Sequence, residues 1–167
     1  MKRYCFDTSG ISNPNENMPE DIHEWLWVWF CDFIKAGHIG VNAEIYDEMC
    51  HIQGMAGDCI RDNKASLLLE IEKGDWDWET YIQNVAAMQA SQAEYISEYT
   101  GGSPRTVCLN DISIVALAKT LAIPLVSMEA TITDPGAKKR RIPNVCAIEG
   151  VDHLTFNQFL KAENAKK

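Results

Sequence analysis

The chain has 167 residues, of which 46% are hydrophobic, and a formal net charge of −9. This length and apolar content predict one domain, residues 1–167, with a hydrophobic core of its own. The acidic balance argues against a generally basic, histone-like mode of nucleic-acid binding, although a local basic patch can still contact a phosphate backbone.

The first third of the chain alternates short apolar runs with a helical pattern. An apolar run ends at Asp7 and precedes turn-forming residues, which is typical of a strand followed by a loop. Gly37 is suited to ending a helix, and Asn42 is suited to capping the next one. The predicted elements are a strand at 3–6, a loop at 8–15, a helix at 20–37, a strand at 38–41 and a helix at 43–52.

The remaining two thirds continue this alternation. Residues 112–122 are apolar nearly all round, which predicts a helix that is buried on most sides. Short strands that alternate with helices indicate an α/β fold with a parallel sheet. The predicted elements are helices at 58–72 and 79–99 (the longest), breaks at 74–78 and 100–104, the helix at 112–122, a strand at 124–127, a basic loop at 134–144, a strand at 145–148 and a helix at 154–162.

Neither the start of the chain nor its cysteines indicate export. The first seven residues lack the apolar region of a signal peptide, and the run at 25–34 is too short to span a bilayer. The six cysteines are scattered without a CxxC pair, which favours reduced thiols over disulfides or a structural zinc site. We therefore expect a cytoplasmic protein that does not bind a membrane.

Several acidic residues are predicted to meet at one edge of the sheet. In a parallel α/β unit, a helix begins near the carboxyl end of one strand, and the next strand returns to the same edge. Asp7 ends the first strand, Asp111 precedes the buried helix, and Glu129 follows the strand after it. The helix at 43–52 adds Glu44 and Glu48, which share a helix face.

Each of these acids also has a purely structural interpretation. Asp111 or Asn110 could be an N-cap, Asp7 a turn residue, and Glu44 and Glu48 the solvated side of a helix. Together, however, several carboxylates at one edge repel one another unless a cation lies between them. Ligation by oxygen alone selects hard ions, so the cluster favours Mg²⁺ or Mn²⁺.

These motifs resemble those of PIN-domain proteins, the nuclease fold of many bacterial toxin–antitoxin ribonucleases. The segments that carry the resemblance are "YCFDTSG", "IGVNAEIYDEM" and "NDISIVALAKTLAIPLVSME". In the second, the acid before an aliphatic residue maps onto Glu48 rather than Glu44. Glu129 stands where the family more often has Asp, and with the basic loop and "IPNVC" it resembles the subfamily DUF4411. The resemblance runs from Tyr4 to about Leu160.

The resemblance implies a three-layer α/β/α sandwich, divalent-metal-dependent RNA cleavage, a homodimer and an antitoxin partner. It implies that Mg²⁺ or Mn²⁺ is held by Asp7, Glu48, Asp111 and Glu129, which would be both metal ligands and catalytic residues. Hydroxyl groups that could orient these carboxylates are those of Thr8, Ser9 and Ser127.

The only dense basic run is "KKRR" in the loop at 134–144. It is either a solvated loop or a contact for RNA phosphates near the acidic edge. Its residues are Lys138, Lys139, Arg140 and Arg141.

Two other functions remain open from the sequence. A catalytically silent PIN-like module would bind RNA or a protein without cutting. A metal-dependent phosphatase also uses an Asp after the first strand, but Ser9 stands where its second Asp would be, which disfavours a phosphoaspartate mechanism.

Overall fold

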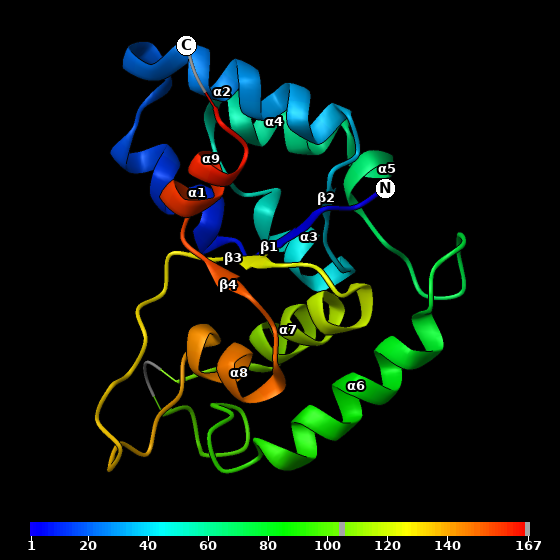
Figure 1. Cartoon of the computed structure of the whole chain (residues 1–167), viewed down its shortest axis with the longest axis vertical. Coiled ribbons are helices and arrows are strands. Elements are labelled where there is room, and N and C mark those ends of the chain that lie inside the picture. Colours follow the sequence, from blue (N-terminus) through cyan, green and yellow to red (C-terminus); the bar gives the residue numbers. More distant parts are fainter. Residues whose placement is uncertain (104–105, 166–167) are drawn as a thin grey trace.

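The computed structural model describes residues 1–103 and 106–165, so the last residue of the predicted break at 100–104 lies outside the described part (Figure 1). A four-stranded sheet forms its centre, and every neighbouring pair of strands is parallel. Its order is β2-β1-β3-β4. The strands are β1 (Tyr4–Phe6), β2 (Ile39–Gly40), β3 (Leu125–Val126) and β4 (His153–Leu154).

Helices cover both faces of this sheet. In Figure 1, α2, α4 and α9 lie above the sheet, and α6, α7 and α8 lie below it. The predicted α/β/α sandwich with a mainly parallel sheet is therefore confirmed. The helices are α1 (Ser9–Asn17), α2 (Glu20–Lys35), α3 (Ala43–Met49), α4 (Gly54–Asp62), α5 (Lys64–Leu67), α6 (Trp78–Ser91), α7 (Leu109–Leu121), α8 (Ile142–Glu149) and α9 (Phe156–Ala162).

The strand order places a topological switch point between β1 and β3. The chain leaves β1 to form β2 on one side, and later returns to form β3 on the other side. Connections on opposite sides leave a crevice at the carboxyl ends of the two strands, where ligands bind in open α/β sheets. Asp7 follows β1 at this point, and Ser127 and Glu129 follow β3.

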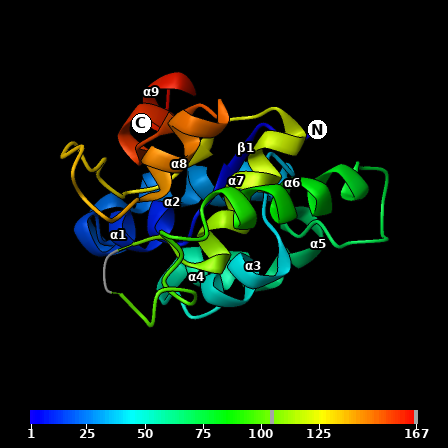
Figure 2. The same ribbon diagram turned by 90° about the horizontal axis from the view of Figure 1, so that it is seen from below.

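Helix α7 is buried on most sides, as its sequence predicted. Every residue from Ile112 to Ala118 is buried, because α6 and α8 pack against it below the sheet (Figure 2). The predicted helix ends at Gly37 and Asn42 are also confirmed. Gly37 has a φ of 76°, and the Asn42 side chain accepts a hydrogen bond of 3.2 Å from the backbone N–H of Ile45.

Two predictions about local structure were wrong. Residues 8–15 belong mostly to α1 rather than to a loop, and Gly10 lets this helix pack on β3, since an added Cβ would lie 2.7 Å from the carbonyl oxygen of Val126. Residues 145–148 lie in α8 rather than in a strand. Pro143 lies at the start of that helix, and the Asn144 side chain accepts from the backbone N–H of Arg141 at 3.1 Å.

Two predicted helices were too long. Helix α6 ends at Ser91, and the chain beyond it packs on the basic loop, where Gln92 bonds Arg140 and the Arg140 guanidinium carbon lies 3.7 Å from the centre of the Tyr95 ring. The helix predicted at 58–72 is two short helices, α4 and α5, and the chain beyond Leu67 turns to pair with Val41. Within residues 1–103 and 106–165, no helix combines the length and apolar character needed to cross a membrane.

Candidate functional site

Asp7 lies at the switch point with its carboxylate turned inward. Only 6% of the residue is exposed, and its Oδ2 accepts hydrogen bonds from the backbone N–H (3.0 Å) and hydroxyl (2.5 Å) of Ser9. The Ser9 hydroxyl also accepts from the backbone N–H of Met128 at 3.1 Å. Ser9 therefore connects the acid after β1 to the segment after β3.

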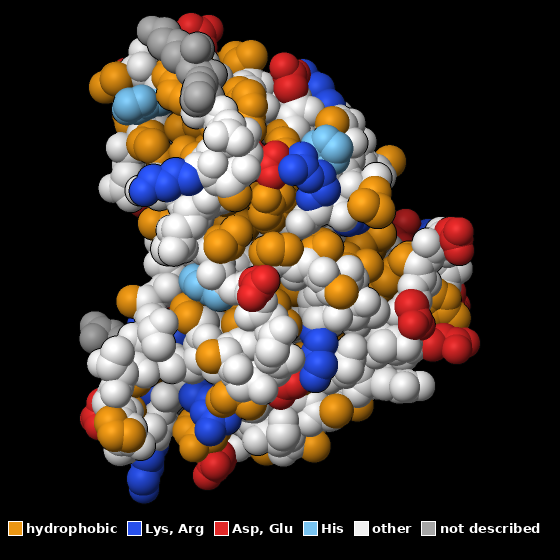
Figure 3. All heavy atoms as spheres, viewed as in Figure 1, with side chains coloured by type: hydrophobic (Ala, Val, Ile, Leu, Met, Phe, Trp, Pro, Cys, Tyr) orange, Lys and Arg blue, Asp and Glu red, His pale blue; other side chains and the backbone are white. Residues whose placement is uncertain are grey.

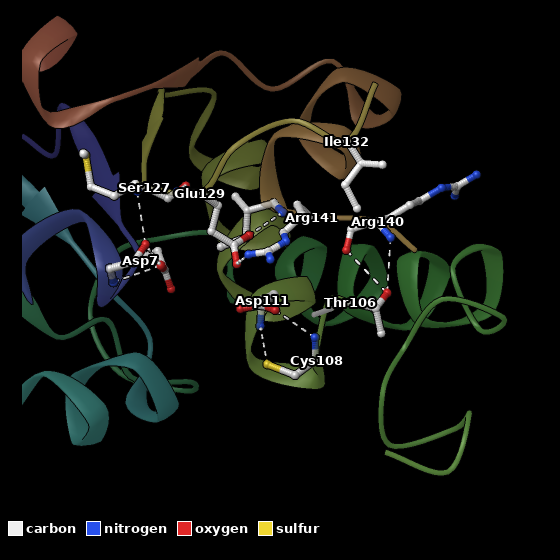
Figure 4. A network of polar contacts seen from close by, with 12 residues as sticks. Asp7, Thr106, Cys108, Asp111, Ser127, Glu129, Ile132, Arg140 and Arg141 are labelled. Carbon is white, nitrogen blue, oxygen red and sulfur yellow. Dashed lines mark hydrogen bonds and ion pairs between the residues drawn. The ribbon is translucent and has the colours of Figure 1, made fainter. Parts of the chain in front are cut away.

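Asp111 enters the site from the first turn of α7. Its Oδ2 accepts a hydrogen bond of 2.8 Å from the backbone N–H of Cys108, which is the actual N-cap residue. The interpretation of Asp111 or Asn110 as the N-cap is therefore wrong, since Asp111 is the third residue of the helix and forms a capping box with Cys108. Figure 4 shows Asp7, Asp111 and Glu129 pointing toward a common space from β1, α7 and the segment after β3.

Glu129 is held by two groups from the opposite side of this space. Its Oε1 lies 3.2 Å from the Arg141 guanidinium, and its Oε2 accepts a 2.8 Å hydrogen bond from the backbone N–H of Ile142 at the start of α8. Ser127 is fully buried and lies 2.8 Å from Nε2 of His153. The backbone N–H of Glu129 donates to the Ser127 hydroxyl over a longer 3.4 Å.

Glu48, rather than Glu44, faces the other acids. The Thr8 hydroxyl donates to its Oε2 at 2.9 Å, and the Asn110 amide donates to its Oε1 at 2.6 Å. Glu44 instead lines a separate cavity beside Tyr81. The geometry therefore favours Glu48 as the member of the cluster from α3.

Asn42 has a positioning role that its sequence context did not reveal. Its amide donates to the hydroxyls of Ser113 (2.6 Å) and Tyr81 (3.1 Å), and the residue is 2% exposed. It thereby ties α3, which carries Glu48, to α7, which carries Asp111. No sequence signal links these residues, because the partners are brought together by the fold.

The pKa values of the two aspartates, Asp7 and Asp111, are both raised. The pKa of Asp7 is raised to about 6, mainly by burial and also by the charges of Glu129 and Glu48, against the lowering effect of the Ser9 hydrogen bonds. Burial also raises the pKa of Asp111 to about 7, with added repulsion from Asp7 and Glu129 and a lowering contribution from Cys108. Each acid therefore experiences the field of the others.

The side chains as placed do not form a closed metal cage. Within the described ranges, no three His, Cys, Asp or Glu side chains converge closely enough to hold an ion. The donor set nevertheless suits Mg²⁺ or Mn²⁺, because all four candidates are carboxylates, and the buried Asp7 and the half-buried Asp111 both have raised pKa values. Asp7 is held by a hydrogen bond from Ser9, and Asp111 by one from Cys108. Glu129 is paired with Arg141, so it would have to break this ion pair in order to bind a metal ion.

The basic run divides into two pairs with different surroundings. Arg140 bonds Gln92 and lies over Tyr95, and Arg141 pairs with Glu129, so both guanidinium groups are engaged within the protein. Lys138 is exposed and Lys139 is half-buried. On the face shown in Figure 3, Lys and Arg side chains are scattered among apolar and acidic ones.

Comparisons with known proteins give a family and several distant structural likenesses. The family described as "Domain of unknown function (DUF4411)" matches residues 4–167. A crystal structure of DNA-bound VapBC from Salmonella typhimurium is similar at 14% identity and a TM-score of 0.46, covering 93% of this chain and 99% of that chain. No curated protein matches the sequence.

Proposed function

We propose that this chain, which belongs to the DUF4411 family, is a metal-dependent ribonuclease that hydrolyses RNA phosphodiesters with Mg²⁺ or Mn²⁺. The observation that carries the proposal is that Asp7, Asp111 and Glu129 point toward a common space at the switch point of the sheet, where the charges of Glu129 and the adjoining Glu48 raise the pKa of Asp7. A buried carboxylate destabilises a fold when ionised, so the buried Asp7 and the half-buried Asp111, both with raised pKa values, support a role in binding a cation.

The residues of the site have distinct roles in this proposal. Asp7 and Asp111 would hold the ion most directly, and Glu48 and Glu129 would complete the oxygen ligands. A bound divalent ion would supply an activated water and charge stabilisation at the scissile phosphate. Ser9 and Thr8 fix the orientation of Asp7 and Glu48 through the hydrogen bonds described above.

Arg141 is positioned to compete with the ion for Glu129. Replacing Arg141 with Gln should tighten Mn²⁺ binding about 1.4- to fivefold, because an ion pair near the surface is worth about 0.2–1 kcal/mol and its removal frees the carboxylate. Calorimetric titration of Mn²⁺ measures the change. The matched control is Arg3→Gln, which removes the Arg3–Glu163 pair of 2.7 Å at the far end of β1. Unchanged binding in Arg141→Gln would contradict the competition.

Lys138 and Lys139 are the members of the basic run that remain available to RNA. Replacing both with Gln should reduce the dependence of RNA binding on salt, by about 0.7 in the log–log slope for each phosphate that the variant no longer neutralises. Fluorescence anisotropy of a labelled RNA in EDTA measures the slope without cleavage. The control is Lys73→Gln, in the loop before α6. If the double variant shows the same slope as this control, Lys138 and Lys139 do not contact RNA phosphates.

One titration separates this proposal from its two alternatives. Mn²⁺ is added to the purified protein together with either a mixed-sequence RNA or a phosphomonoester. Cleavage of RNA supports the ribonuclease, and hydrolysis of the monoester alone supports a phosphatase. Binding of RNA without reaction of either substrate supports a silent binding module.

We also propose that the ribonuclease is the toxin of a toxin–antitoxin pair and forms a homodimer. The support is the sequence resemblance to PIN-domain toxins, so this step is independent of the site geometry. Induced expression of the wild type should arrest growth, and expression of Asp7→Asn should not. Equal growth of the two cultures would contradict the toxin role while leaving RNA cleavage to be judged by the titration.

A further inference from the structure

Helix α2 packs along α4 (Figure 1), and each of the two helices contributes one cysteine to their contact. Cys31 lies in α2 and Cys59 in α4, and their exposed fractions are 5% and 7%. The Cys59 sulfur lies 3.7 Å from the carbonyl oxygen of Cys31. The Cys31 thiol lies 3.8 Å from the carbonyl oxygen of Met55. The two sulfurs therefore form a pair that bridges two helices.

A cavity of about 480 Å³ gives access to this pair. Both cysteines line it, together with Met55, Lys35 and Val28. Val28 is 45% exposed, so the cavity opens to solvent beside it. The two cysteines thus have little exposed surface but line a cavity that is open to solvent, which gives a small molecule a route toward them.

The surroundings make the two thiols unequal. The pKa of Cys59 is lowered by its interaction with the Cys31 thiol and by the charge of Lys35, against opposing effects of burial and of Asp62 and Asp32. The pKa of Cys31 is raised by the same thiol interaction and by burial. The Cys59 sulfur also accepts a hydrogen bond of 3.6 Å from the side-chain amide of Asn63, which stabilises its thiolate. Since the thiolate is the reactive form of cysteine, Cys59 is the nucleophile of the pair and Cys31 the second thiol.

We propose that Cys31 and Cys59 form a dithiol site that exchanges with low-molecular-weight disulfides. The Cys59 thiolate attacks one sulfur of the external disulfide, whose S–S bond breaks to release one thiolate. Cys31 then loses its proton and attacks the sulfur of Cys59 in the mixed disulfide, which releases the second thiolate. The two protein thiols are oxidised to one disulfide, and the external disulfide is reduced to two thiols that take up the two protons.

The other four cysteines provide comparisons within the same chain. Cys5 and Cys146 are fully buried and do not line this cavity, so they should stay unmodified. Cys50 and Cys108 are partly exposed, and Cys108 caps α7. Cys50→Ser is the matched control, because it removes a more accessible thiol that lies outside the pair.

Oxidised glutathione and mass spectrometry test the site on the native chain without any substrate. The reduced protein is incubated with oxidised glutathione, trapped with iodoacetamide and mapped by peptide. The wild type and Cys50→Ser should each form a Cys31–Cys59 disulfide and release two equivalents of glutathione through that pair. Cys31→Ser should stop at a mixed disulfide on Cys59, and Cys59→Ser should leave Cys31 unmodified.

Two results would overturn the proposal. A glutathione adduct that persists on Cys59 of the wild type would show that Cys31 does not resolve it. Unmodified Cys31 and Cys59 in protein whose Cys50 or Cys108 has reacted would show that the cavity does not admit the reagent. Both results come from the folded wild type, so neither depends on the stability of a variant.

Discussion

Replacing Asp7 with Asn is expected to reduce Mn²⁺-dependent RNA cleavage by at least about 100-fold, the range seen when one electrostatic contact to a transition state is removed. Asn keeps the shape of the side chain but lacks the charge that would hold the ion. Asp7 is 6% exposed, and its carboxylate is bonded to Ser9, so the substitution directly alters only contacts within the site. Initial rates on a labelled RNA, measured over a range of Mn²⁺ concentrations, give the size of the reduction.

The matched control is Asp152→Asn, which replaces an exposed aspartate just before β4, at the opposite end of the strands. This variant should cleave RNA at the rate of the wild type. Thermal unfolding in EDTA should show Asp7→Asn at least as stable as the wild type, so a decrease in activity cannot be attributed to unfolding. Full activity in Asp7→Asn would refute the assignment of Asp7 to the metal site.

The position of the site could be predicted because it follows from topology. Short apolar runs before Asp7 and Glu129 indicated parallel strands, and parallel strands present their carboxyl ends at one edge. The buried helix over 112–122 then brought Asp111 back to that edge. These inferences need only the order of elements, and a boundary error of a few residues does not change them.

The local partners of the acids could not be predicted in this way. The hydrogen bond between Asn110 and Glu48 joins residues 62 positions apart, and the pairing of Arg141 with Glu129 depends on where α8 begins. That start was missed because residues 145–148 are apolar enough to suit a strand. Pro143 was the available signal, since proline favours the first turn of a helix.

Helix α1 illustrates a second limit of local patterns. Thr, Ser, Gly, Asn and Pro are turn formers, but several of them also begin helices, so the same composition suits both. The outcome is decided by packing, because Ile11 is fully buried and Gly10 lies against β3. That packing involves a strand more than a hundred residues away, and no window of sequence contains it.

The metal-free protein should lose stability as the pH rises from about 4 to about 7. The pKa values of Asp7 and Asp111 in the folded protein, about 6 and about 7, lie above the unfolded value near 3.9. In that window the folded state binds more protons than the unfolded state, so each acid favours folding at low pH and ceases to do so as it ionises. For Asp7 alone, the free energy of unfolding should fall by roughly 2 kcal/mol between about pH 4.5 and about pH 8.

Urea denaturation in EDTA at these two pH values measures the decrease, and Asp7→Asn isolates the part due to Asp7. Burial lowers the pKa of His153, which acts in the opposite direction, but this contribution is common to both proteins and cancels in the comparison. At the higher pH, Mn²⁺ at a hundred times its Kd should add about 2.7 kcal/mol to the wild type and less to the variant. A pH dependence that is identical in wild type and Asp7→Asn would mean that the Asp7 carboxylate is solvated, and the physical reason for placing a cation beside it would disappear.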